Sequence, residues 1–115
     1  MDQPTVDRAT FDELKETAGA DFVAELVDAF LDEAPRLLDD LRAAYERRDA
    51  EVFRRTAHSL KSNGNTFGAR TFAAMAKDLE LGGMSPVAAA GGTPIDALAT
   101  EFGRVGAALK ELCHA

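Results

Sequence analysis

The chain has no tryptophan, one tyrosine and one cysteine among its 115 residues. A lone cysteine excludes an internal disulfide, which fits the reducing cytoplasm, our expected location. No apolar run approaches the roughly 18 residues that a membrane span requires, so we expect no membrane association. The acidic, polar N-terminus lacks the basic start and apolar stretch of a signal peptide. Acidic residues outnumber basic ones by 20 to 13, and the resulting net charge of −7 argues against nucleic-acid binding.

The residues that are abundant favour α-helix along the whole chain. Ala, Leu, Glu, Lys and Arg are abundant, and β-branched residues never alternate over a useful length. The periodicity predicts an all-α fold, an antiparallel (up-and-down) four-helix bundle with a short extra N-terminal helix. We place the whole chain in one domain, 1–115, with helices at about 10–18, 21–48, 50–63, 69–81 and 94–112.

Capping patterns suggest where these helices begin. The predicted N-caps are Thr10 (in a capping box with Glu13), Asp21, Asp49 and Thr93. Pro35 should bend the second helix without ending it, because the apolar periodicity continues past it. The run Asn63-Gly64-Asn65 indicates a turn or a tight helical passage. Residues 85–92 form a small-residue linker with room for one helical turn.

His58, one of two histidines, lies in the segment AHSLKSNGNTFG at residues 57–68. On a helical wheel it falls about 160° from Leu60, outside the apolar stripe, so we interpret it as exposed rather than as a core histidine. Residues 52–77 contain five cations and no acid: Arg54, Arg55, Lys61, Arg70 and Lys77. We therefore expect positive charge beside the ring and no carboxylate.

This surrounding suits phosphoryl transfer. A neutral imidazole is a good nucleophile near neutral pH, and nearby cations would stabilise the negative charge that it acquires. Lys61, one turn after His58 and expected to face solvent, is the best placed, and the Ser62 hydroxyl can donate a hydrogen bond to a phosphate oxygen. Arg54, Arg55 and Asn65 would form the rim of a docking surface.

The sequence resembles the histidine-containing phosphotransfer (HPt) domains of bacterial phosphorelays. The similar segments are residues 57–61 (AHSLK), 67–69 (FGA) and 79–80 (LE), with 30–35 (FLDEAP), Leu37, Leu38, Leu41 and Asp49 upstream. One departure is Ser62, because the family usually has glycine directly after the lysine. Ser62 is still small, and Gly64 follows two places later.

The resemblance implies a carrier and not an enzyme. His58 would take a phosphoryl group from the aspartyl phosphate of a receiver domain and pass it to another receiver aspartate, with Lys61 as the supporting cation. The partners would be receiver domains of response regulators or hybrid histidine kinases. The receiver would bring the Mg²⁺, so this chain, a monomer in this reading, would need no cofactor. The absence of a G-x-x-x-x-G-K-[ST] loop agrees with this.

Other interpretations remain. The chain could be the phosphotransfer segment of a chemotaxis-type or hybrid histidine kinase, or an HPt-like helical binding module without phosphotransfer. A kinase dimerisation domain is disfavoured, because an acidic residue typically follows its histidine and Ser59 follows here. The Glu111-to-His114 spacing resembles half of a di-iron site but has no second copy, and we predict no metal site.

Overall fold

The computed structural model describes residues 5–113, which form six helices and no strand. The helices are α1 (Arg8–Ala18), α2 (Ala20–Arg47), α3 (Ala50–Thr66), α4 (Arg70–Gly82), α5 (Met84–Ala89) and α6 (Thr93–Cys113). The all-α prediction is confirmed, and helices occupy all five predicted segments. The sixth, α5, is the helical turn for which the 85–92 linker had room.

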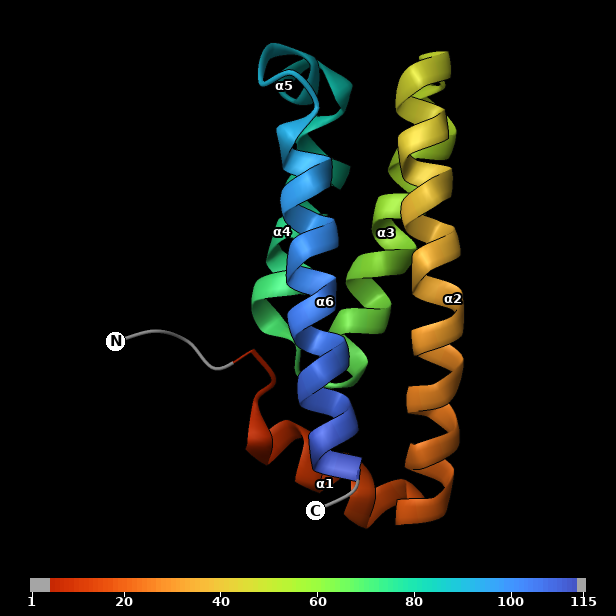
Figure 1. Cartoon of the computed structure of the whole chain (residues 1–115), viewed down its shortest axis with the longest axis vertical. Helices are drawn as coiled ribbons and strands as arrows, with labels where there is room; N and C mark the ends of the chain where they lie inside the picture. The colour runs from red at the N-terminus through yellow and green to blue at the C-terminus, as the bar shows by residue number, and fades with distance from the viewer. Residues whose placement is uncertain (1–4, 114–115) are drawn as a thin grey trace, which may run out of the picture.

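Helices α2, α3, α4 and α6 run along the long axis of the molecule (Figure 1). Within this group α3 packs on α2 and α4, and α6 packs on the same two helices. The short α1 crosses one end and contacts α2, while α5 lies at the opposite end between α4 and α6. No helix within residues 5–113 has both the length and the apolar character needed to cross a bilayer.

The helix starts correct several predicted caps. Asp7, not Thr10, caps α1, because its carboxylate accepts a hydrogen bond from the Thr10 backbone N–H at 3.2 Å. Asp21 lies inside the first turn of α2, where an acid favours the helix dipole, and is not its cap. The prediction for Asp49 is confirmed, since its carboxylate accepts from the Val52 N–H at 3.2 Å.

The last helix begins at Thr93 itself, so this residue is not an N-cap in the expected sense. Its hydroxyl donates to the carbonyl oxygen of Ala90 at 2.9 Å instead of accepting from a helical N–H. The prediction that α2 continues past Pro35 is confirmed, because the helix has no break at this residue.

Gly64 explains why α3 is three residues longer than predicted. The helix continues through Asn63-Gly64-Asn65 to Thr66, so the tight helical passage, not the turn, is correct. Gly64 is buried against α4, and a Cβ built there would lie 2.8 Å from Cδ1 of Phe72. Only glycine permits this close approach without moving the phenylalanine ring.

An aromatic cluster anchors the helices around the core. The ring centroid of Phe30 lies 5.3 Å from that of Phe67 and 5.5 Å from that of Phe102, distances typical of favourable aromatic pairs. On α3, Phe53, Ala57 and Leu60 are completely buried. Because this face is fixed in the core, the opposite face of α3 is presented to solvent in a defined orientation.

Candidate functional site

The outer face of α3 carries His58. Its side chain is 55% exposed, whereas its neighbour Ala57 is fully buried. The ring therefore lies outside the core, as the helical wheel predicts, and the core-histidine interpretation is wrong. An incoming protein can reach the imidazole without any rearrangement of the bundle.

A carboxylate from α4 holds the ring, which corrects our expectation that none would lie beside it. Nδ1 of His58 is 2.9 Å from Oε2 of Glu80, although 22 positions separate the two residues. Residues 52–77 contain no acid, but the packing of α4 on α3 brings in the next part of the chain. Glu80 is only 13% exposed, so its position is well defined.

This contact leaves one of the two ring nitrogens with a free lone pair. In a neutral imidazole one nitrogen carries the proton and the other a lone pair, and a carboxylate can only accept a hydrogen bond. Glu80 therefore assigns the proton to Nδ1 of His58 and the lone pair to Nε2. The expectation that no carboxylate would lie beside the ring treated the imidazole as one site, whereas only one of its two nitrogens contacts the carboxylate.

Lys61 completes a three-residue network. Its Nζ lies 2.8 Å from Oε1 of Glu80, and its side chain is only 23% exposed, so the prediction that it faces solvent is wrong. The contact is an ion pair, and Oε1 of Glu80 is buried. Lys61 is the largest cause of a lowered pKa for the Glu80 carboxyl; contact with His58 also lowers this pKa, and partial burial opposes both. Glu80 is therefore ionised at neutral pH.

Comparison with known proteins identifies the family. The Hpt domain model matches residues 25–115. The chain belongs to the Hpt domain family. A solved structure, that of histidine-containing phosphotransfer protein B (HptB) from Pseudomonas aeruginosa PAO1, is similar with a TM-score of 0.83 and 28% sequence identity, over 98% of this chain and 97% of that one. No curated protein matches the sequence. The resemblance seen in the sequence is confirmed, and the chain is placed among the phosphotransfer carriers of phosphorelays.

The other predicted site residues lie in different places on the surface. Arg54 and Arg55 are exposed and line the same recess as the His58 ring. This recess has a volume of about 330 Å³ and is lined by Arg54, Arg55, His58, Ser59 and Glu80. Asn65 belongs to a different recess of about 240 Å³, lined by Lys61, Asn65, Arg70, Ala73, Ala74 and Lys77. Ser62 is exposed on the outer face of α3, one turn after His58.

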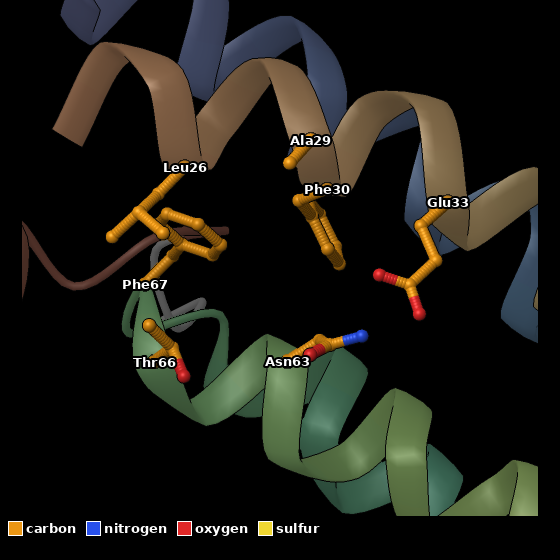
Figure 2. Close-up of a pocket in the computed structure, with 7 residues that line it drawn as sticks. All are labelled: Leu26, Ala29, Phe30, Glu33, Asn63, Thr66 and Phe67. Atoms are coloured by element: carbon orange, nitrogen blue, oxygen red, sulfur yellow. The ribbon is translucent and has the colours of Figure 1, made fainter. Parts of the chain in front are cut away.

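A third recess lies between α2 and α3, and four of its seven lining residues are apolar. Its volume is about 180 Å³, and it is lined by Leu26, Ala29, Phe30, Glu33, Asn63, Thr66 and Phe67. Figure 2 shows the Phe30 ring directed into it, with the Glu33 and Asn63 side chains facing each other across one end. The α3 residues of this recess follow His58 by one to two turns.

Within residues 5–113 of the Hpt domain, no group of three or more His, Cys, Asp or Glu side chains is arranged to hold a metal ion. His114, the last residue of the Glu111-to-His114 spacing, lies outside the described residues. That spacing therefore stays untested.

Proposed function

We propose that this Hpt domain carries a phosphoryl group on Nε2 of His58, accepted from a receiver-domain aspartyl phosphate and passed to another receiver aspartate. One observation supports this most directly. The ring is exposed, and its Nδ1 is engaged by Glu80 at 2.9 Å, so Nε2 is the nitrogen available to a visiting phosphoryl group. An exposed histidine without a fixed tautomer would present its lone pair on either nitrogen.

The transfer step needs little from the chain beyond this arrangement. The Nε2 lone pair attacks phosphorus, the N–P bond forms, and the P–O bond to the aspartate breaks, which releases a carboxylate. No proton has to leave Nε2, and the Nδ1 proton stays in place. The positive charge that the ring gains lies beside the Glu80 carboxylate, which Lys61 keeps ionised. Transfer to the next aspartate is the same step in reverse.

The receiver supplies the rest of the chemistry. In this proposal it holds the Mg²⁺ and docks over the α2–α3 recess, with Arg54, Arg55 and Asn65 at the rim. The sequence predicts Lys61 and Ser62 as supports for the phosphoryl group, and the pairing of Lys61 with Glu80 favours an indirect role for the lysine. The proposal treats the chain as a monomeric cytoplasmic carrier, not an enzyme, and takes α2, α3, α4 and α6 as the expected up-and-down bundle.

The experiment is incubation of wild type and His58→Gln with a phosphorylated receiver. Wild type should take up a label that is acid-labile and alkali-stable, as a phosphoramidate is, and NMR should assign the phosphorus to Nε2. His58→Gln should remain unlabelled. Acid-stable label, label on the variant, or phosphorus on Nδ1 would each contradict the proposal.

A further inference from the structure

We infer that Arg54 and Arg55 hold the phosphoryl group on His58, and that Lys61 acts on it only through Glu80. This inference rests on the proposed function, and it assigns the phosphate-contacting cations to the N-terminal side of the histidine. The lysine one turn later, which the sequence favoured for that role, becomes a positioning residue.

The first argument is placement. Arg54 and Arg55 precede His58 by four and three residues, so all three side chains lie on neighbouring positions of the outer face of α3. Together they line the same recess of about 330 Å³, with the Ser59 hydroxyl beside them. A group attached to the ring within this recess would meet two guanidinium groups and a hydroxyl donor. The fifth lining residue, Glu80, contacts the ring at Nδ1 and not at Nε2.

The second argument is the state of the charges. None of the ion pairs described within residues 5–113 involves Arg54 or Arg55. Lys61, in contrast, is already paired with Glu80 at 2.8 Å and is largely covered. Two guanidinium groups that form no ion pair suit phosphate oxygens better than one ammonium group that is already paired. Each guanidinium can donate two parallel hydrogen bonds to a phosphate.

The third argument is direction. Nδ1 of His58 faces Glu80, so a phosphoryl group on Nε2 projects from the other side of the ring, away from the carboxylate that holds Lys61. Lys61 lines a separate recess of about 240 Å³ that His58 does not line. His58 and Lys61 therefore both contact Glu80, but they line different recesses of the surface.

The test uses potassium phosphoramidate, which phosphorylates imidazole without a receiver. The Nε2–P bond forms, the P–N bond to the amine breaks, and ammonia leaves. Wild type, the double variant Arg54→Gln/Arg55→Gln, Lys61→Gln and the control Lys110→Gln are each phosphorylated as full chains. Lys110→Gln removes one positive charge from an exposed position on α6. Circular dichroism checks that each variant is folded.

The readout is the pKa of the phosphoryl group, followed by the ³¹P chemical shift against pH. Nearby cations favour the dianion, so the double variant should titrate roughly 0.5–1 unit higher than wild type. Lys61→Gln should shift this pKa less than the double variant does, and Lys110→Gln should match wild type. Arg54→Lys/Arg55→Lys should restore part of the difference, since charge returns without the planar fork.

Two results would overturn the inference while leaving the proposed function in place. One is a double variant that titrates as wild type does, and the other is a larger shift in Lys61→Gln than in the double variant. Failure of wild type to become phosphorylated on His58 would instead contradict the proposed function, and this inference with it.

Discussion

Nδ1 of His58 and Oε2 of Glu80 lie 2.9 Å apart, on two different helices. The contact distinguishes the two ring nitrogens: Nδ1 holds a proton against the carboxylate, and Nε2 keeps its lone pair, which attacks phosphorus in the proposed function. The reactivity of this histidine is therefore a property of the α3–α4 pair and not of α3 alone.

Glu80→Gln should slow phosphorylation of His58 by roughly tenfold, the lower end of the cost of removing a partner that orients a histidine. The amide can donate as well as accept, so it no longer selects one tautomer. Rates of labelling by phosphoramidate would measure this. Glu111→Gln, an exposed glutamate on α6, serves as the matched control. Equal rates for wild type and Glu80→Gln would contradict the role of the carboxylate.

The same substitution should change how stability depends on pH. The lowered pKa of the Glu80 carboxyl means that its ionised form stabilises the folded chain. This contribution is fully present above the unfolded-state pKa of about 4.3, and it is lost as the pH falls through the lower folded-state pKa. Urea unfolding should show wild type more stable than Glu80→Gln at pH 7, with the difference shrinking in acid. A difference that is constant with pH would argue against the ion pair.

Gly64→Ala should destabilise the chain by about 1–3 kcal/mol, the usual cost of adding a methyl group to a filled core. The new Cβ would lie 2.8 Å from Cδ1 of the fully buried Phe72, so the ring or the helix would have to shift. Gly103→Ala is the control, because a Cβ there meets nothing within 4 Å on an exposed face of α6. It should stabilise by about 0.5–1 kcal/mol through helix propensity. Thermal or urea unfolding would measure both, and equal effects of the two substitutions would contradict the close α3–α4 approach.

Ala29→Arg should weaken transfer from a receiver by roughly tenfold, equivalent to about 1.4 kcal/mol. Ala29 is exposed and lines the α2–α3 recess, so a long charged side chain there blocks the recess without entering the core. Phosphorylation by phosphoramidate should not change, since that reaction needs no docking. Ala107→Arg, at an exposed position of α6, controls for the added charge. If both arginine variants accept phosphoryl groups from the receiver as fast as wild type does, docking does not use this recess.

Local sequence patterns were sufficient to predict the helices and the direction of the histidine. The wheel places His58 opposite Leu60, and the structure has the first exposed and the second fully buried. Both follow from the 3.6-residue period, which depends only on neighbours along one helix. For the same reason Asp49 could be recognised as a cap from three residues of sequence.

The residues that were missed depend on how helices pack together. Glu80 lies 22 positions from His58, and its approach depends on the register of α4 against α3, which no local pattern encodes. Its one signal was its place as the first glutamate after the acid-free stretch 52–77, within a segment (79–80) that resembles the family. The extension of α3 past Asn63 has a similar origin, because Gly64 packs closely against α4 and no local pattern encodes that contact.

The sharing of one carboxylate by His58 and Lys61 has a consequence for regulation. A phosphorylated ring carries positive charge at Nδ1–H and so attracts Glu80, and with it α4, more strongly than the neutral ring does. Thermodynamic reciprocity requires the converse: a protein that binds α4 and shifts Glu80 toward or away from α3 must alter the free energy of the phosphorylated state relative to the unphosphorylated one. A partner bound to α4 would therefore shift the phosphorylation equilibrium of His58 on α3.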